Sequence, residues 1–401
     1  MPAVIDVSKT DDPRDVVHVA VQALAEGKLV AFPSETTYGV AASGLHDGAV
    51  ARLKRLAERV SPDGCGLVLR SCDEALDYAP HLSPLGQRLV RRCWPGPIVI
   101  QSPESTHESL VSRLPAATQD VLTASGAVAL RVPAHGLIAS ALRLAVGPLL
   151  WTSIASPASA GSHGSGSGGT RSAERAWACT GAEAAAAVGD EVALVLDDGR
   201  TRFAGAASTV SIQGNCIRLL HEGVLNQTTI ARLSSLMVLF VCTGNTCRSP
   251  MAEVLMQQRA AKRLECDLAS LQDRGIWIMS AGIAAMSGAA ASPEAHEAVC
   301  PRGLDLMQHE SQPVTDRLIR FADYIITMTR GHRDAVLAQW PEAASRTKLL
   351  SRSNADVSDP IGGPLELYRR CAEQIDGYLE GWEREIAWDQ LPQFWAAGLE
   401  N

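Results

Sequence analysis

The clearest pattern of hydrophobic and polar positions lies in the second half of the chain. Residues 237–241 are apolar throughout and two of them are β-branched, which predicts a short buried strand. Pro250 opens a run of good helix formers over 251–260, so we predict a helix with Pro250 at its first position. The eight residues 242–249 are therefore expected to form a loop between a strand and a helix.

The same alternation continues to the end of the chain. Apolar runs predict further strands at 275–282, 321–329 and 347–350, and the apolar spacing predicts helices at 293–299 and, as one or two segments, 365–388. We expect a Rossmann-like, three-layer α/β fold with a central parallel sheet for this part.

The first half of the chain shows a related pattern. A helical period over 15–27 is followed by a strand at 29–33, a polar loop at 34–39 and a helix at 46–60. Strand patterns recur at 66–70, 127–132, 148–152 and 192–196, and their alternation with helices predicts a twisted α/β sheet. The Gly- and Ser-rich stretch at about 158–170 is interpreted as a flexible insertion in this sheet.

The length of 401 residues is more than one ordinary core needs, so we predict two domains, at 1–233 and 236–401. The net charge of −8 argues against nucleic-acid binding by bulk electrostatics, although a local basic patch is compatible with it. Ten cysteines without a secretory pattern predict reduced thiols in the cytoplasm, and no apolar run is long enough for a membrane span. No paired Cys-x2-Cys motif suggests structural zinc, so we expect no metal.

The predicted loop has the chemistry of a phosphate cradle. Gly244 permits unusual dihedral angles, and such a loop turns successive N–H groups inward at a helix N-terminus, where a tetrahedral oxyanion can bind. Cys242 lies in the resulting positive field, which favours the nucleophilic thiolate. Arg248 supplies a planar fork for two phosphate oxygens.

The sequence Val-Cys-Thr-Gly-Asn-Thr-Cys-Arg-Ser-Pro-Met-Ala-Glu (241–253) resembles the signature of the low-molecular-weight protein tyrosine phosphatases. The resemblance implies that Cys242 attacks phosphorus, that Arg248 holds the phosphoryl oxygens, that Ser249 stabilises the thiolate and that Asn245 supports the loop. It also implies that Asp359, in an Asp-Pro pair, is the general acid and base. The remaining predicted loop residues are Thr243, Gly244, Thr246 and Cys247.

Two features bear on the substrate, which we expect to be a phosphorylated protein. Thr246 stands where tyrosine phosphatases of this family usually have an aliphatic residue, and the Asp-Pro pair is followed by 361–363 (Ile-Gly-Gly) without aromatic side chains. Both features resemble bacterial protein-arginine phosphatases, so we place phosphoarginine first and phosphotyrosine second. An arsenate reductase that uses Cys300 and Cys371 is a further alternative. Cys247 either traps oxidised Cys242 as a disulfide or fills the loop floor. His309 and His332 are interpreted as structural.

The first half resembles the threonylcarbamoyl-adenylate synthase (YrdC) family through 29–39 (Leu-Val-Ala-Phe-Pro-Ser-Glu-Thr-Thr-Tyr-Gly), 93–97, 130–133, 198–199 and 207–210. The resemblance implies a domain that joins threonine, bicarbonate and ATP for tRNA modification. The nucleotide-binding positions depart from the family pattern, because 57–59 reads Ala-Glu-Arg, no asparagine follows Ser153, and His221 occupies the position of an arginine.

We therefore interpret the YrdC-like site as eroded, with ATP as a candidate ligand of this first domain. We expect the phosphatase to need no cofactor. A working ligase and a pure binding module that recruits the phosphatase to RNA, such as double-stranded RNA, or to a protein partner remain alternatives for the first domain. RNA or a nucleotide is the partner we expect at this domain. The pocket residues that the resemblance implies are Ser34, Thr36, Tyr38, Arg59, Arg131, Ser153 and Ser208.

Overall fold

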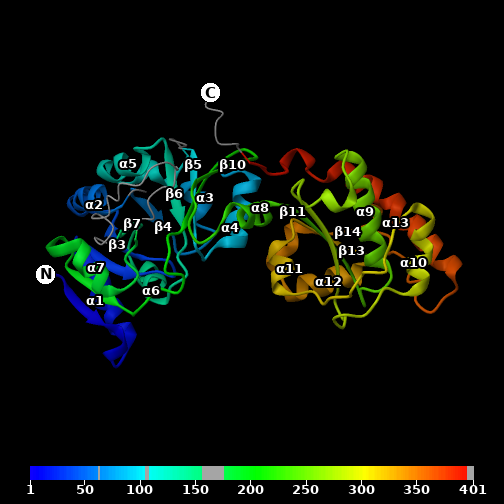
Figure 1. Ribbon diagram of the computed structural model, residues 1–401, viewed down its shortest axis with the longest axis horizontal. Helices are drawn as coiled ribbons and strands as arrows, with labels where there is room; N and C mark the ends of the chain where they lie inside the picture. Colours follow the sequence, from blue (N-terminus) through cyan, green and yellow to red (C-terminus); the bar gives the residue numbers. More distant parts are fainter. Residues whose placement is uncertain (62–63, 104–107, 156–175, 395–401) are drawn as a thin grey trace, which may run out of the picture. The chain divides into compact units, whose positions relative to one another are not determined.

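The computed structural model describes residues 1–61, 64–103, 108–155 and 176–394, and the predicted insertion at 158–170 lies outside them. The chain divides into two compact units, one comprising Met1–Ile230 with Phe394 and the other comprising Ala231–Gln393 (Figure 1). Each unit is built on its own sheet. None of the helices in the described residues is both long and apolar enough to cross a bilayer.

The first unit contains a mixed sheet whose strands run in the order β1-β8-β2-β3-β7-β4-β6-β5-β9-β10-β15, in which the last is a two-residue strand (Gln393–Phe394). These strands are β1 (Ala3–Asp6), β2 (Val30–Pro33), β3 (Tyr38–Ser43), β4 (Gly66–Val68), β5 (Ile98–Pro103), β6 (Ala127–Arg131), β7 (Leu149–Ser153), β8 (Leu194–Asp197), β9 (Ser208–Gln213) and β10 (Cys216–His221). The helices are α1 (Pro13–Ala25), α2 (Asp47–Val60), α3 (Ala75–Tyr78), α4 (Pro84–Cys93), α5 (Ala116–Thr123), α6 (Gly136–Leu144) and α7 (Gly181–Val188), and the division between the units falls within α8 (Gln227–Ser234). This confirms the predicted α/β sheet.

The predicted polar loop at 34–39 is shorter than expected. β3 begins at Tyr38 and pairs antiparallel with β2, so that Phe32 lies opposite Gly39. Only four residues connect the two strands, and the Ser34 hydroxyl closes their turn by donating to the Thr37 carbonyl at 2.6 Å. The sequence pattern missed the strand because the polar residues of the turn run directly into it.

The second unit has a four-stranded sheet in the order β12-β11-β13-β14. Its strands, β11 (Leu236–Cys242), β12 (Ile276–Gly282), β13 (Tyr324–Thr327) and β14 (Thr347–Leu349), are all parallel. The helices are α9 (Arg248–Arg263), α10 (Pro293–Val299), α11 (Asp316–Phe321), α12 (Arg330–Gln339) and α13 (Leu365–Glu385). The predicted central parallel sheet is confirmed.

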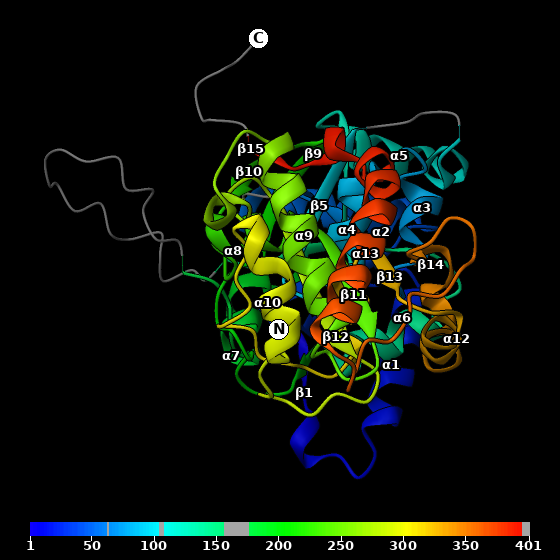
Figure 2. The same cartoon turned by 90° about the vertical axis from the view of Figure 1, so that its right-hand side faces the viewer.

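Alternate side chains of β11 enter two separate cores. Val238 and Phe240 pack with residues of α9, α10 and α13, whereas Leu239 and Val241 pack with α11 and α12. Figure 1 shows the helices on both faces of the sheet, and α10, α9 and α13 run side by side in Figure 2. Burial on both faces explains why β11 is apolar along its whole length.

Helix α9 begins at Arg248, two residues before the predicted start at Pro250. Pro250 occupies the third helical position, where its missing N–H costs nothing because the first N–H groups of a helix have no partner within the helix. Arg248 and Ser249 therefore belong to the first turn of the helix as well as to the loop.

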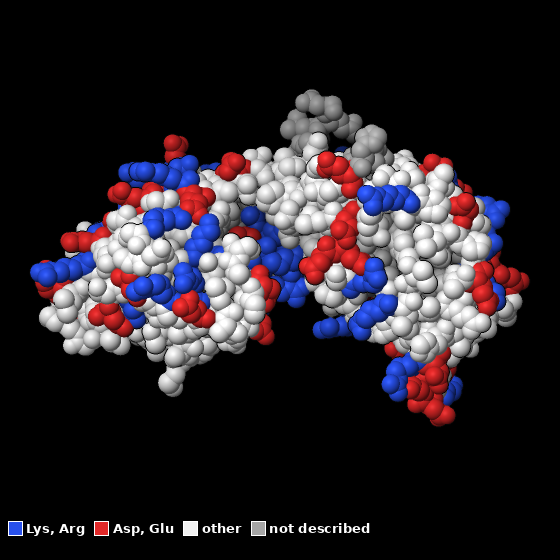
Figure 3. Space-filling view, turned by 180° about the vertical axis from the view of Figure 1, so that it is seen from behind, with Lys and Arg blue, Asp and Glu red and all other residues white. Residues whose placement is uncertain are grey.

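On the face shown in Figure 3, Lys and Arg side chains are interspersed with Asp and Glu over much of the surface.

Candidate active site

The loop that joins β11 to α9 is held from outside through its carbonyl groups. Cys242, Thr243 and Thr246 each accept a backbone hydrogen bond at 2.9 Å, from the N–H groups of Ile283, Ala284 and Ser292, respectively. The Asn245 N–H points to Cys242 Sγ, inside the loop, at 3.2 Å. An oxyanion cradle requires N–H groups that are turned inward in this way.

Two backbone features of the loop were not foreseen correctly. The left-handed conformation falls on Asn245 (φ 56°), and Gly244 does not adopt it. Asn tolerates this conformation better than most residues. Gly282, at the end of β12, is the glycine that the site requires, because a Cβ atom there would clash with the Thr243 carbonyl. The Ser-Ala-Gly sequence of this strand was the available signal.

Cys242 ends β11 with its side chain 2 % exposed. Its Sγ atom lies 2.9 Å from the Ser249 hydroxyl and accepts a hydrogen bond from the Asn245 N–H at 3.2 Å. The Ser249 oxygen accepts from the Asn245 side-chain amide at 3.0 Å, and the nearer acceptor for its own proton is Cys242 Sγ, because the Ala281 carbonyl lies at 3.5 Å. Two donors therefore converge on the predicted nucleophile, which stabilises a thiolate.

A buried network supports Asn245 from behind. The Asn245 amide nitrogen donates to the Ser280 hydroxyl at 2.8 Å, and its side-chain oxygen accepts from the Gln312 N–H at 2.9 Å. Ser280 in turn donates to a Glu253 carboxyl oxygen at 2.5 Å. Burial raises the pKa of Glu253 to about 7. Glu253 belongs to the 241–253 signature, but neither its position nor that of Ser280 in the sequence predicted this contact.

The Asp359 carboxylate lies directly against Arg248. The Arg248 Nη2 atom donates to Asp359 Oδ2 at 2.6 Å and to the Thr243 hydroxyl at 3.4 Å. The Arg248 side chain is 6 % exposed and that of Asp359 is 44 % exposed. The structure thus brings the three residues predicted to carry catalysis to one loop, with the carboxylate on its open side.

Both histidines contact the loop. The His309 Nε2 atom lies 2.8 Å from the Asn245 carbonyl oxygen, which can only accept, so this nitrogen carries the proton. Burial lowers the pKa of His309. The His332 Nε2 atom lies 2.9 Å from the Thr243 hydroxyl. The spacing of the sequence offers no signal for this second contact, because His332 belongs to α12.

Thr246 and Cys247 complete the loop. The Thr246 hydroxyl lies 3.5 Å from Cys247 Sγ, which also contacts the Ser292 hydroxyl at 3.3 Å and the buried Tyr368 hydroxyl at 3.9 Å. Cys371 is buried in the same core, where burial raises the pKa of its thiol to about 12. Cys300 is exposed and lies on the short helix after α10.

In the first unit, part of the predicted pocket comes together around Arg131. Its Nη2 atom donates to Glu35 and to the Thr36 hydroxyl, both at 2.8 Å, and the Thr36 hydroxyl lies 2.9 Å from that of Ser34. All four side chains are buried. The Arg131 cation is thus neutralised by Glu35, a residue that the sequence analysis did not select.

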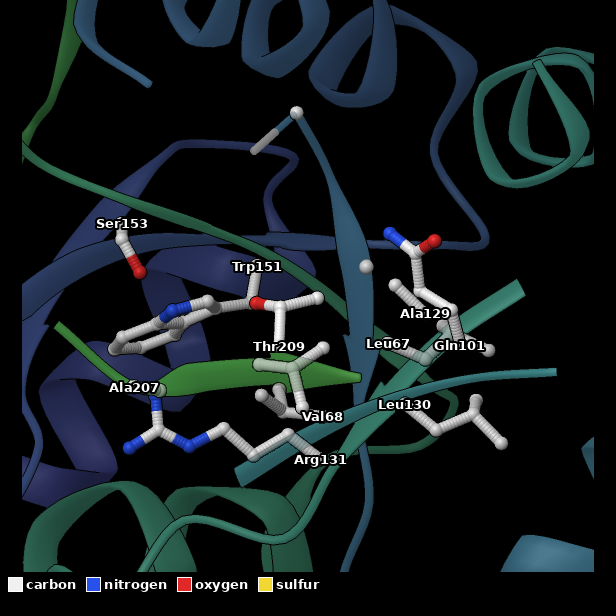
Figure 4. A pocket seen from close by; sticks show the side chains of 13 residues that line it. Leu67, Val68, Gln101, Ala129, Leu130, Arg131, Trp151, Ser153, Ala207 and Thr209 are labelled. Carbon is white, nitrogen blue, oxygen red and sulfur yellow. The ribbon is translucent and has the colours of Figure 1, made fainter. Parts of the chain in front are cut away.

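A small pocket beside Arg131 is lined by Trp151, Ser153 and Thr209, with Ala207 at its edge (Figure 4). The remaining predicted pocket residues, Tyr38, Ser208 and Arg59, do not line this pocket and have hydrogen-bond or ion-pair partners of their own. The Tyr38 hydroxyl donates to the Gly199 carbonyl at 2.7 Å, and the Ser208 hydroxyl donates to the Leu225 carbonyl at 2.7 Å. Arg59, at the end of α2, forms an exposed ion pair with Glu191 at 2.6 Å. Within the described residues, no group of three or more His, Cys, Asp or Glu side chains could hold a metal ion.

Comparison with known proteins gives two separate matches. Residues 237–391 match the family model of the low molecular weight phosphotyrosine protein phosphatases, and residues 22–162 match the Sua5/YciO/YrdC model, described as telomere recombination. A protein-arginine-phosphatase of Geobacillus stearothermophilus is 32 % identical over 157 residues, which are 38 % of this chain and 97 % of that protein. A probable low molecular weight protein-tyrosine-phosphatase of Ralstonia nicotianae is 31 % identical over 150 residues, 37 % of this chain and 94 % of that protein.

The first unit has a relative of its own. A threonylcarbamoyl-AMP synthase of Pyrococcus abyssi is 30 % identical over 133 residues, which are 33 % of this chain. The matched segment spans only 36 % of the length of that protein.

Proposed function

Through residues 237–391 the chain belongs to the low molecular weight phosphotyrosine protein phosphatase family, and on this premise we propose that it hydrolyses phosphoarginine in proteins through a phosphocysteine intermediate. The observation that carries the proposal is the convergence of two donors on Cys242 Sγ, with Arg248 of the same loop paired at 2.6 Å with Asp359 from the connection between β14 and α13.

In the first step the Cys242 thiolate attacks phosphorus and the bond from phosphorus to the guanidino nitrogen breaks. Asp359, in its protonated form, gives its proton to that nitrogen, so that arginine leaves without a negative charge. Arg248 exchanges its contact with Asp359 for two phosphoryl oxygens, and the inward N–H groups of the loop take the remaining charge.

In the second step water attacks the phosphocysteine and Asp359 accepts a proton from the water. The bond from phosphorus to sulfur breaks, and inorganic phosphate and the Cys242 thiolate are released. The hydrogen bonds from Asn245 and Ser249 stabilise that thiolate as the leaving group, so the same donors serve both steps.

Two features of the loop support phosphoarginine over phosphotyrosine. Ile361 follows the Asp-Pro pair with 69 % of its surface exposed, and the next aromatic residue along the chain, Tyr368, is 2 % exposed and contacts Cys247. A phenyl ring would lack a stacking partner worth about 0.5–1.5 kcal/mol per pair at this position. The Thr246 hydroxyl adds a polar group that suits a guanidino nitrogen better than a ring.

The first unit supports a weaker proposal, that of a YrdC-like domain with an eroded adenylate-forming site. Its Arg131 is paired with Glu35, and Arg59 lies in an exposed pair with Glu191. Neither arginine is therefore left with an unneutralised charge that could bind the triphosphate of ATP. A retained ligase that uses ATP and threonine is the second candidate for this unit, favoured by the buried cluster of Ser34, Thr36 and Arg131.

Substitution of Cys242 tests the phosphatase proposal. We expect Cys242→Ser to abolish release of phosphate from every phosphorylated substrate, because an alcohol is a far weaker nucleophile than a thiolate. Cys371→Ser is the matched control, since this buried thiol lies in the same core and has a pKa near 12. Phosphate release by Cys242→Ser near the wild-type rate would overturn the mechanism. Loss of arsenate reduction in Cys371→Ser, with the phosphatase intact, would support the arsenate reductase alternative.

A further inference from the structure

The Thr243 hydroxyl occupies an unusual position at the start of the loop. It lies 2.9 Å from His332 Nε2 and accepts a hydrogen bond from Arg248 Nη2 at 3.4 Å. The same Nη2 atom reaches Asp359 at 2.6 Å. Thr243 is itself exposed, whereas Arg248 and His332 are buried. The hydroxyl therefore sits on the open side of the loop, within reach of whatever Arg248 binds.

His332 is neutral in this environment. Burial and the nearby Arg248 cation lower its pKa to about 4, and the opposing effects of Asp359 and Asp356 are smaller. A neutral imidazole carries one proton, on either Nδ1 or Nε2. His332 Nδ1 is buried and has no hydrogen-bond partner in the part of the chain that the structure describes.

This unpartnered nitrogen decides which tautomer is present. If Thr243 donated to Nε2, the proton would be on Nδ1, as a buried N–H group without an acceptor. Orphaned buried N–H groups are rare because they lose their hydration without compensation. The proton is therefore on Nε2, and His332 donates to the Thr243 oxygen.

The direction of the Thr243 proton follows. A hydroxyl oxygen has two lone pairs and one proton, and here N–H groups of His332 and Arg248 occupy the lone pairs. No protein acceptor takes the Thr243 proton among the described residues, so the hydroxyl is a donor directed at the open side of the loop.

We propose that the Thr243 hydroxyl donates a hydrogen bond to the phosphoryl oxygen that Arg248 binds, and that His332 is the positioning residue that fixes this direction. Thr243 is thus a further residue in contact with the transferred group. The inference rests on the proposed function for the presence of a phosphoryl group, but it does not depend on whether arginine or tyrosine carries that group.

Orthovanadate, an analogue of phosphate that becomes trigonal-bipyramidal when a thiolate adds to vanadium, tests the inference without turnover. We expect Thr243→Val to weaken orthovanadate binding to the full-length protein about tenfold, because a hydrogen bond to a charged group is lost, whereas Thr243→Ser stays within about twofold. The control is Thr347→Val, which removes a buried hydroxyl bonded to the Ala343 carbonyl elsewhere in the same unit. Its affinity should equal that of the wild type.

His332 is tested by a double-mutant cycle. His332→Leu should weaken orthovanadate binding like Thr243→Val, and His332→Gln should restore part of the loss because an amide N–H can donate to the hydroxyl. The double variant Thr243→Val/His332→Leu should bind no more weakly than Thr243→Val alone. The 15N spectrum of the wild type should show an unprotonated His332 Nδ1. Circular dichroism of each variant verifies that it is folded.

Three results would overturn the inference. They are an orthovanadate affinity of Thr243→Val within twofold of that of the wild type, a loss of affinity on His332→Leu that is the same in the wild type and in the Thr243→Val background, and a protonated His332 Nδ1. A different result would refute the proposed phosphatase function. A wild-type protein that binds orthovanadate but dephosphorylates neither phosphoarginine nor phosphotyrosine would refute the phosphatase and leave the role of Thr243 intact.

Discussion

At Cys242 the protein holds one sulfur atom with donors from the middle and the end of the same loop. The Asn245 N–H comes from the residue that adopts the left-handed conformation, and Ser249 belongs to the first turn of α9. The amide side chain of Asn245 is fixed by Ser249, Ser280 and Gln312. Neither a small residue nor another polar residue can therefore replace Asn245, because the site depends on both its left-handed backbone conformation and its side-chain amide.

Thr246 is the residue at which substrate preference should be most easily changed. Replacing its hydroxyl by the apolar side chain of Thr246→Ile removes a polar contact for a guanidino group and adds surface that packs against a ring. We expect the ratio of kcat/KM for phosphoarginine over phosphotyrosine to fall about tenfold or more. The measurement is steady-state kinetics on both substrates at one pH. A ratio equal to that of the wild type would remove the main residue-level argument for phosphoarginine.

The catalytic residues that could be predicted from the sequence are those that stand in short motifs of neighbouring residues. Cys242, Arg248 and the Asp359-Pro pair stand in recognisable short motifs, and the structure places them together. Ser280, Glu253 and His332 come from β12, α9 and α12, and only the packing of these elements brings them to the loop. Their catalytic or positioning roles remain predictions.

At the scale of elements, β11, α9 and β12 meet in the chain of contacts from Cys242 to Glu253. The apolar run of β11 and the parallel sheet could be predicted because burial on both faces leaves a continuous apolar pattern. The first turn of α9 could not, since Pro250 marks the usual start of a helix and gives no signal that Arg248 and Ser249 before it are already helical.

Glu253 makes the stability of the second unit depend on pH. Its pKa is raised from 4.5 to about 7 in the folded state, so the folded protein binds more protons than the unfolded chain between these values. Stability is therefore lost as the pH rises through this window. We expect Glu253→Gln to raise the stability at pH 8 by about 1–3 kcal/mol, or a few degrees in Tm, with much less effect at pH 4.5.

The measurement is the Tm of the thermal transition that orthovanadate raises, which reports on the second unit. Wild type and Glu253→Gln are compared at pH 4.5 and pH 8, so that other titrating groups cancel in the difference. A difference in Tm that is the same at both pH values would show that folding does not change the pKa of Glu253 and that the burial argument is wrong.

At the scale of the whole molecule, two units with separate sheets share one chain. The division into two α/β parts could be predicted from the change of motifs and from the length. The chemistry of the first unit could not be predicted in the same way, because its candidate residues are scattered. Arg131, Thr36 and Ser34 cluster, whereas Arg59 and Ser208 have partners of their own.

For the first unit we expect no pyrophosphate release that depends on threonine when the full-length protein is given ATP, bicarbonate and threonine. The reason is that Arg131 and Arg59 are each paired with a carboxylate. The assay is coupled pyrophosphate detection, with threonine omitted as the control. Release that requires threonine and disappears in Arg131→Ala would establish the bifunctional alternative instead.

The most direct test of the account is kcat/KM of the purified full-length protein on a phosphoarginine and a phosphotyrosine substrate, measured in parallel. The account predicts a clear preference for phosphoarginine, because Thr246 lines the loop and no aromatic residue follows the Asp359-Pro pair. A preference for phosphotyrosine would contradict it and would mean that other residues form the walls of the pocket.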